Sequence, residues 1–367
     1  MAPERLSLSQ RVDQFFLYQR QGRFDFMDGL RGWALVMIFN VHFLGIYESR
    51  FYFLGEGAFL NRLLSMFNAG HAGVDLFFIL SGFLIYTTIQ RKRSGFWRFL
   101  LNRCGRLFPA LLVVNLPLIA TQAKTIPDVI DNLLILGLFP GTDLYNVVEW
   151  ALTYQLYFYG LAAVWFITLA RWRFSQGWTF YWLLAIAIYL QHQTGIFGPT
   201  GVPRFMSMIW GVGLAKLYGS PKLWDRLGPR LSWAWPLGIA LVYAARWYWT
   251  GHAAEIIHGR WQWAAYFSCI DLGFLITIAA LLANRGLGRR VLGWKPLRVV
   301  GSVSYSAFLI HGVWAIPLAQ ILVKSLDPGF DSLALHWLAS MGLTVLISVF
   351  LYAYLERVYF RPAPAQV

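Results

Sequence analysis

The sequence predicts an all-α integral membrane protein, a polytopic bundle of about ten transmembrane helices. Of its 367 residues, 58% are hydrophobic and only 13% are charged, whereas a soluble domain carries about a quarter charged residues. The mean hydropathy is +0.52, and apolar windows of roughly 17–25 residues, long enough to cross a bilayer, recur along almost the whole chain. The 18 Trp, 18 Tyr and 29 Phe suit membrane interfaces. Together these observations exclude a soluble protein with a large apolar core.

Ten apolar segments account for the predicted spans. They lie at 33–49, 73–90, 107–123, 150–170, 179–192, 204–219, 232–249, 263–284, 303–324 and 333–357. The stretch 130–139 is too short to cross, so we expect it to lie at the interface or to be re-entrant. Because no repeat or linker divides the chain, we expect a cytoplasmic N-terminal segment at 1–32, one transmembrane domain at 33–357 and a cytoplasmic tail at 358–367.

The basic residues predict the orientation. Most of the 31 Lys and Arg lie in short loops on one side of the predicted spans, as in the clusters at 91–106 and 285–298. The positive-inside rule places this side, with both termini, in the cytoplasm, and an even number of spans agrees. The net charge of +14 is thereby explained without a nucleic-acid partner. We expect a multi-pass protein of the bacterial cytoplasmic (inner) membrane.

The cysteines and the N-terminal residues limit the remaining classes. Cys104 and Cys269 provide no disulfide framework and no CxxC metal site, so no metal is predicted. The first apolar segment follows about thirty residues that include acidic side chains, unlike the short basic start of a signal peptide. We therefore expect no cleavable signal peptide.

Arg31 lies just before the first apolar segment and His42 lies within it. Ionisable residues within a span are costly, so each is a functional candidate. Their spacing is close to three helical turns, which places both on one face, about 16 Å apart along the axis. Arg31 would lie at the cytoplasmic end and His42 at or beyond mid-membrane. A snorkelling Arg with a structurally bonded His explains the pair equally well at this point.

The second segment begins near the outer surface with His71 and Asp75. Asp75 could orient an imidazole, as carboxylates orient catalytic histidines. A carboxylate in the first turn would also be stabilised by the helix dipole. Further along, Ser81 and Gly82 are better explained by close helix packing than by a nucleophile.

Other polar residues recur at the predicted ends of later segments. Arg103 and Arg106, on one helix face beside a helix N-terminus, indicate a cytoplasmic phosphate site, although topogenic charge explains them equally well. Tyr154 with Gln155, and Arg204, lie near the outer side. His311 is better explained as a satisfied interior histidine.

An ordered series of these residues resembles the acyltransferase-3 family of bacterial membrane O-acyltransferases. The sequence DGLRG at 28–32 followed by His42 is similar to the family's motif of Arg or Lys, ten residues and His. GVDLFFILSGFLI at 73–85 resembles its second-helix block, and RCGR at 103–106 with Pro109 resembles its RxxR segment. Similar blocks follow at 150–159, at 204–211, at 304–311 and at Glu356. The resemblance covers nearly the whole chain, from residue 25 to about residue 357.

The resemblance implies transfer of an acyl group, acetyl by default, from cytoplasmic acyl-CoA to a carbohydrate or other acceptor across the membrane. Acetyl-CoA or another acyl-CoA would be the donor, with no permanently bound cofactor. The implied partners are the carbohydrate acceptor (exopolysaccharide, O-antigen or a lipid-linked sugar), the lipid bilayer and proteins of polysaccharide synthesis or export. Some members carry a fused extracytoplasmic hydrolase-like domain. Without one here, we expect direct transfer to the acceptor or a separate partner.

One position departs from the family pattern. The fourth-helix block commonly carries Glu where this chain has Gln155. Gln can hold a hydroxyl or a His by hydrogen bonding, but it cannot accept a proton as a base. This puts a catalytic carboxylate at that position in doubt and makes Asp75 the better candidate partner of His42.

These residues suggest one mechanism and two rival classes. His42 would be the general base, with Asp75 orienting it. The catalytic candidates are His42, Asp75 and Arg31, the donor-binding candidates are Arg103, Arg106 and Arg31, and the substrate-binding candidates are His71, Tyr154, Gln155 and Arg204. A transporter or flippase for a glycolipid or small polar solute, and a non-catalytic subunit of a polysaccharide synthesis complex, remain open alternatives.

Overall fold

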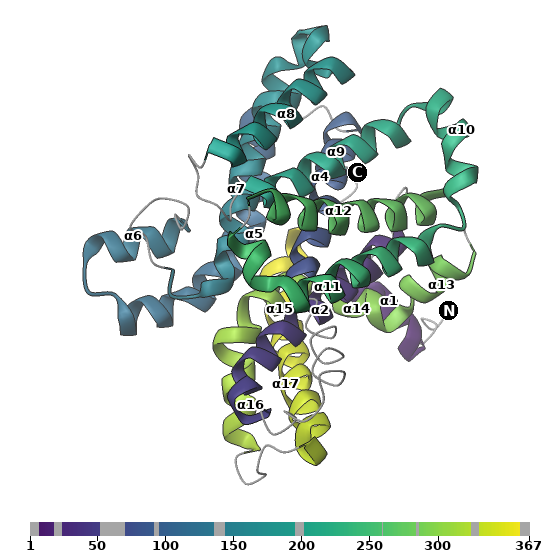
Figure 1. Cartoon of the computed structure of the whole chain (residues 1–367). Helices are drawn as coiled ribbons and strands as arrows, with labels where there is room; N and C mark the ends of the chain where they lie inside the picture. The colour runs from purple at the N-terminus through teal and green to yellow at the C-terminus, as the bar shows by residue number, and fades with distance from the viewer. Residues whose placement is uncertain are drawn as a thin grey trace, which may run out of the picture.

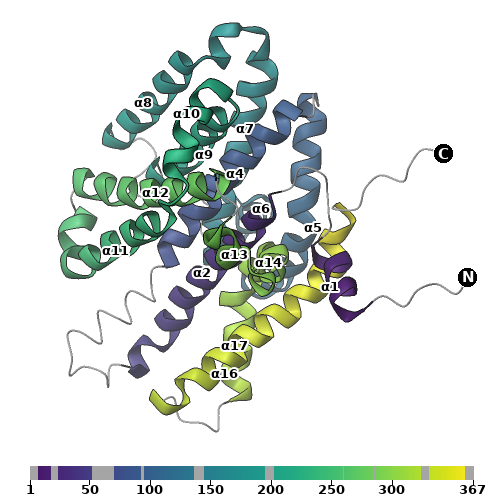
Figure 2. The ribbon, with the colours of Figure 1, turned by 90° about the vertical axis from the view of Figure 1, so that its right-hand side faces the viewer.

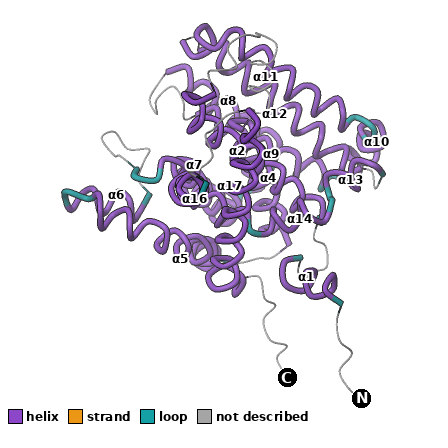
Figure 3. The backbone as a smooth tube through the Cα atoms, turned by 90° about the horizontal axis from the view of Figure 1, so that it is seen from below, coloured by secondary structure: helices purple, strands orange, loops and turns teal. Residues whose placement is uncertain are grey.

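A computed structural model of the chain describes residues 7–17, 24–51, 70–91, 95–135, 144–194, 202–258, 260–283, 286–323 and 330–359. Within these ranges the protein consists of helices and their connections, with no strand (Figures 1 and 3). The predicted all-α class is therefore confirmed.

The helices follow the predicted segments. In chain order they are α1 (Leu8–Phe16), α2 (Asp25–Phe51), α4 (Gly70–Arg91), α5 (Phe96–Gln122), α6 (Ile126–Leu134), α7 (Trp150–Ala163), α8 (Trp178–Thr194), α9 (Val202–Tyr218), α10 (Pro221–Leu231), α11 (Trp235–His258), α12 (Arg260–Ala283), α13 (Leu287–Leu292), α14 (Lys295–Ser302), α15 (Ser304–Ile310), α16 (Ile316–Leu322) and α17 (Phe330–Leu351). Short 3-10 turns are η2 (Val147–Glu149), η4 (Leu169–Arg171), η5 (Arg173–Gln176) and η8 (Arg357–Tyr359), and π-helical turns are η3 (Val164–Thr168), η6 (His311–Ala315) and η7 (Tyr352–Glu356).

Six helical stretches of the described residues are long and apolar enough to cross a membrane. They are Gly70–Arg91, Phe96–Gln122, Val147–Arg171, Trp261–Ala283, Ser304–Leu322 and Ser332–Glu356. Trp178–Leu190 is apolar but shorter, and the other three predicted segments fall on α2, α9 and α11. The protein is thus a multi-pass membrane protein, while the count of ten and the cytoplasmic placement of the termini stay predictions.

The short stretch near residue 130 forms a separate helix, α6, of nine residues. Its length is too small for a bilayer, and it lies at the periphery beyond α5 (Figures 1 and 3). A capping box between Thr125 and Asp128 begins it, since the threonine side chain and the N3 carboxylate each bond to the other's backbone N–H. Residues 136–139 of the predicted interfacial stretch lie outside the described residues.

The two described ends of the chain lie on the same side of the molecule (Figure 2). The Phe16 ring stacks on Tyr352 at 5.9 Å between centroids, and the Arg357 guanidinium lies 4.2 Å from the centre of the Phe15 ring. These contacts pack α1 against η7 and η8, which follow α17.

Glycines allow α4 and α9 to cross in direct contact. A Cβ added to Gly82 would lie 2.0 Å from the Met208 carbonyl oxygen, and one added to Gly211 would lie 2.1 Å from the Ile79 carbonyl oxygen. Only residues without a side chain permit this approach, which is the usual device of close membrane-helix packing. The prediction that Gly82 serves helix packing is confirmed. The crossing also brings Asp75, two turns before Gly82, against the start of α9.

Candidate active site

A pair of histidines joins α2 to the helix that carries η6. His42 Nδ1 lies 2.9 Å from His311 Nε2 and 2.9 Å from the carbonyl oxygen of Ile38, one turn earlier on α2. His311 Nδ1 lies 2.8 Å from the carbonyl oxygen of Phe308. The fold therefore joins two residues that are 269 positions apart in the sequence.

The hydrogen bonds of this pair indicate which ring nitrogens carry protons. A carbonyl oxygen can only accept, so His311 Nδ1 is a donor and, in the neutral ring, His311 Nε2 is an acceptor. His42 Nδ1 is then the donor to His311 Nε2, and the nitrogen of His42 without a proton is Nε2. A neutral His42 thus presents Nε2 as a base.

His311 lies where the ninth predicted span departs from α-helical geometry. The π-helical turn η6 begins at this residue, and such turns inside α-helices occur frequently at functional sites. The His311 side chain is fully buried. Its interpretation as a satisfied interior histidine is correct for Nδ1 but incomplete, because Nε2 bonds to His42.

Three arginines line one cavity of about 110 Å³ between α2, α4, α5, α7 and α15. We call it the arginine cavity. Its lining includes Arg31, Arg103 and Arg106, together with Gln155 and Tyr159. The structure thus brings together all three predicted donor-binding residues, although Arg31 comes from a different helix.

Aromatic and backbone contacts fix the walls of the arginine cavity. The Arg103 guanidinium lies 5.5 Å from the centre of the Phe99 ring and 5.8 Å from that of Tyr159, distances at which cation–π attraction is favourable. The Tyr305 hydroxyl donates to the carbonyl oxygen of Leu107 over 2.6 Å. These contacts hold α5, α7 and α15 around the cavity.

Glu356 closes the same region from the end of η7. Its side chain is fully buried and accepts hydrogen bonds from the backbone N–H of Ser306 at 3.2 Å and from the Ser306 hydroxyl. Arg31 and Arg106 lie within electrostatic range of it. One carboxylate thus lies near two of the three arginines without lining their cavity, so the region keeps a net positive charge and suits an anion.

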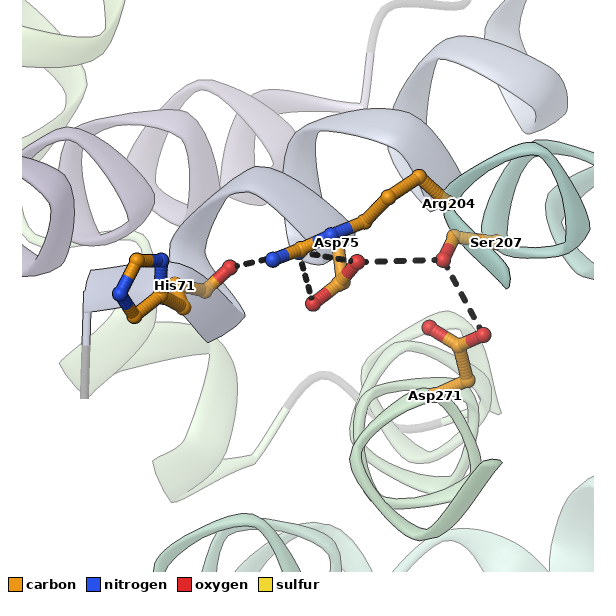
Figure 4. A network of polar contacts seen from close by, with 5 residues as sticks. All are labelled: His71, Asp75, Arg204, Ser207 and Asp271. Carbon is orange, nitrogen blue, oxygen red and sulfur yellow. Dashed lines mark hydrogen bonds and ion pairs between the residues drawn. The ribbon is translucent and has the colours of Figure 1, made fainter. Parts of the chain in front are cut away.

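Asp75 contacts Arg204 in the structure, not His42. A single guanidinium nitrogen of Arg204, Nη1, lies 2.6 Å from each oxygen of the Asp75 carboxylate and donates to the His71 carbonyl oxygen over 2.9 Å (Figure 4). The Arg204 guanidinium lies 4.3 Å from the centre of the Phe267 ring. The expectation that Asp75 orients His42 is therefore corrected: a buried carboxylate pairs with the full charge of an arginine in preference to a neutral imidazole.

The two predicted substrate-binding residues of α7, Tyr154 and Gln155, lie in different surroundings. Gln155 lines the arginine cavity, and its Nε2 is buried without a hydrogen-bond partner among the described residues. The Tyr154 ring packs instead against Phe78 and Phe205, with centroid distances of 6.2 and 6.1 Å. Gln155 is thus placed to bind a ligand of the arginine cavity, whereas Tyr154 belongs to the surrounding core.

The sequence did not single out Glu149, a fully buried carboxylic residue directly before α7. Its Oε2 accepts from Asn115 Nδ2 at 2.8 Å and its Oε1 from Asn146 Nδ2 at 3.1 Å. Asn146 Nδ2 also donates to the carbonyl oxygen of Leu309 at 3.0 Å. Glu149 therefore links α5 and α7 to the turn of α15 just before His311. Its position at the start of an apolar span was the available signal.

Comparison with known proteins is consistent with this arrangement. A search of curated proteins and one of solved structures give no match. The model of the family described as "Acyltransferase domain" (Acyl_transf_3) matches residues 24–353. This match includes both histidines and every residue of the arginine cavity named above. The chain belongs to the acyltransferase-3 family of membrane proteins.

Proposed function

We propose that the protein is an O-acyltransferase of the bacterial inner membrane that moves an acyl group, acetyl by default, from cytoplasmic acyl-CoA to a hydroxyl of a carbohydrate acceptor at the outer side. The observation that carries the proposal is the His42–His311 pair, whose hydrogen bonds leave His42 Nε2 as the base. Membership of an acyltransferase family supports the reaction class.

The arginine cavity is the proposed donor site. Arg31, Arg103 and Arg106 line it, and guanidinium groups bind phosphate oxygens through charge-assisted hydrogen bonds. The predicted orientation places these residues toward the cytoplasm, where acyl-CoA is available. The separation of about 16 Å between Arg31 and His42 is comparable with the length of a pantetheine arm, so the thioester could reach the level of His42.

Phe308 connects the proposed donor site with the base. Its side chain lines the arginine cavity, and its carbonyl oxygen accepts the hydrogen bond from His311 Nδ1. The two functional clusters therefore share one turn of α15, which supports a thioester that extends from the arginines toward the histidines.

The proposed chemistry is direct transfer. His42 Nε2 takes the proton of the acceptor hydroxyl while the oxygen attacks the carbonyl carbon of the thioester. The new C–O ester bond forms, the C–S bond breaks, and the leaving thiolate of CoA receives a proton, for which His42 is the nearest proposed source. The apolar surroundings exclude water and so suppress hydrolysis of the thioester.

The first test is acyl transfer from radiolabelled acetyl-CoA by the protein in membrane vesicles, with polysaccharide of the source cell as acceptor. We expect His42→Ala to lower kcat by about 10²–10⁴-fold, the usual contribution of a general base. His252→Ala is the matched control, because His252 stacks on Tyr248 in α11 and takes no part in the site. Near-normal transfer by a folded His42→Ala protein would refute the base assignment.

The donor site is tested separately by acetyl-CoA binding. The double variant Arg103→Ala/Arg106→Ala should lose binding, whereas Arg98→Ala, which removes an exposed arginine of the same helix, should keep it. Unchanged affinity of the double variant would remove these arginines from the donor site. A transporter or a non-catalytic subunit would transfer no acetyl group in the first assay, so the transfer measurement decides between the rival classes.

A further inference from the structure

A second carboxylate lies beside the Asp75–Arg204 ion pair. Asp271 of α12 is 2% exposed, and its Oδ2 lies 3.1 Å from the Ser207 hydroxyl (Figure 4). The same hydroxyl lies 3.4 Å from Asp75 Oδ1. A serine hydroxyl has one proton to donate, so the two carboxylates share a single donor.

The Arg204 guanidinium is the cation of this cluster, and its hydrogen bonds go to groups other than Asp271. Arg204 pairs with Asp75 and with the His71 carbonyl, and no ion pair of Asp271 occurs among the described residues. Asp271 Oδ1 is buried and has no hydrogen-bond partner in the same part of the chain. An acidic oxygen inside a membrane span without a partner is costly, which indicates a group that binds there.

Asp271 lines a separate cavity of about 50 Å³ between α8, α9 and α12. We call it the outer cavity. Tyr189, Trp210 and Ser268 also line it. Since one water needs about 10–15 Å³ of such space, the cavity has room for a few hydroxyl-sized groups.

The outer cavity lies in the half of the bundle that the predicted orientation places away from the cytoplasm. The neighbouring surfaces of α8 and α12 are apolar, with Ile186 53%, Leu190 57% and Trp261 63% exposed. In a membrane protein such surfaces face lipid. The outer cavity therefore lies beside a lipid-facing surface of the bundle.

The lining chemistry selects a neutral, hydroxylated ligand. No Lys or Arg is among the lining residues, so the outer cavity offers no cation for the phosphates of acyl-CoA. A carboxylate oxygen accepts hydrogen bonds from hydroxyls, and aromatic faces pack against the C–H groups of a sugar ring. Apolar walls with a few fixed polar groups are typical of small-molecule sites.

We propose that the outer cavity binds the hydroxyl-bearing edge of a neutral sugar ring, with Asp271 Oδ1 accepting from one or two of its hydroxyls and Trp210 and Tyr189 packing against the adjoining C–H groups. That this ring belongs to the acyl acceptor rests on the proposed function. Ser207, Asp75 and Arg204 connect Asp271 to the backbone of His71 at the outer end of α4.

The test is sugar binding by the whole protein in lipid nanodiscs, measured by saturation-transfer NMR without acyl-CoA. The probes are methyl glycosides of glucose, galactose, mannose and N-acetylglucosamine, and the octyl glycosides of the same sugars. We expect saturable binding of at least one sugar, with an affinity at least about tenfold lower in Asp271→Asn and in Trp210→Leu. Asp225→Asn, which changes an exposed carboxylate of α10, should bind like the wild type.

The two probe sets identify the source of the sugar. Binding of the octyl glycosides alone supports a lipid-linked sugar that enters from the bilayer, and binding of both sets supports a glycan that enters from the aqueous phase. Absence of saturable binding by every probe, or equal affinity in the two cavity variants with unchanged melting temperature, overturns the proposal. Because acyl-CoA is absent, this result is independent of the transfer assay.

Discussion

At the scale of single residues, the proposed chemistry depends on the proton that His42 Nδ1 donates to His311 Nε2 over 2.9 Å. His311 is then a positioning residue, which orients the His42 ring, while the Ile38 carbonyl oxygen, also 2.9 Å from Nδ1, helps to keep the unprotonated nitrogen at Nε2. The orientation of His311 is fixed by the Phe308 carbonyl. This division of roles resembles the orientation of a catalytic histidine by a buried acceptor, with an imidazole in place of a carboxylate.

We predict that His311→Ala lowers kcat by at least about tenfold while the KM for acetyl-CoA stays unchanged, because the His42 ring loses the partner that holds its orientation but the donor site is intact. His311→Asn, whose amide oxygen can accept from His42 Nδ1, should retain more activity. The measurement is steady-state transfer kinetics in vesicles. Equal kcat values for the alanine and asparagine variants would argue for a purely structural His311.

Single residues also show where sequence reasoning ends. Arg31 and His42 are recognisable from the sequence because ionisable groups rarely occur in an apolar helix without a function. The partner of Asp75 was not predictable in the same way. From the sequence, His42 was the favoured partner, and only the crossing of α4 and α9 brings Arg204 to 2.6 Å from the Asp75 carboxylate.

At the scale of elements, the turn before α7 is held by a buried polar cluster. Glu149 bonds to Asn115 of α5 and to Asn146, and Asn146 bonds to Leu309. The cluster fixes α15 immediately before His311 and the π-helical turn. The geometry of the histidine pair therefore depends on a residue outside the cavity.

We predict that Glu149→Ala lowers the free energy of unfolding by about 2–4 kcal/mol, because it leaves buried amide donors without an acceptor. Glu149→Gln should cost less, since its amide oxygen still accepts from one asparagine and its amide nitrogen can donate to the Asn115 or Asn146 oxygen. Those two oxygens have no partner among the described residues. Unfolding in mixed micelles of increasing SDS content measures the difference.

An equal loss of stability in both Glu149 variants would contradict this account, because the charge and not the hydrogen bonds would then hold the cluster. Asp131→Ala is a useful reference for the measurement. Asp131 is an acidic residue of α6 that takes no part in the Glu149 cluster. Its replacement should change stability by less than about 0.5 kcal/mol.

Helix position follows from apolar length, but helix irregularity does not. The predicted spans 303–324 and 333–357 match Ser304–Leu322 and Ser332–Glu356 closely. Their π-helical turns at His311 and Tyr352 were not predictable, because a π turn changes the hydrogen-bond register by one residue while leaving the apolar composition unchanged.

At the scale of the whole molecule, the orientation remains the main prediction. The proposed path from cytoplasmic donor to outer acceptor requires the arginine cavity to face inward and the outer cavity to face outward. The packing of α1 on η7 and η8 establishes only that the two ends lie together. Which compartment they occupy follows from the loop charges.

We predict that Lys124→Cys, before α6, reacts with a membrane-impermeant maleimide added to intact spheroplasts, whereas Lys222→Cys, in α10, reacts only after permeabilisation. Both lysines are exposed, so accessibility within the protein does not bias the comparison. Both cysteine variants are made in the Cys104→Ser/Cys269→Ser protein. This parent protein, which contains no cysteine, is the control for unspecific labelling. The reverse labelling pattern would invert the orientation and would contradict a cytoplasmic donor site.

The sequence by itself determined the class of the molecule, its apolar helices and the three arginines and Gln155 of the arginine cavity. These properties depend on composition, on helical spacing and on the cost of charge in a membrane, all of which are local to the chain. The tertiary structure decided the partners: His311 for His42, Arg204 for Asp75, and Ser207 for Asp271. Each of these contacts joins residues more than sixty positions apart, and only helix packing brings such residues within hydrogen-bond distance.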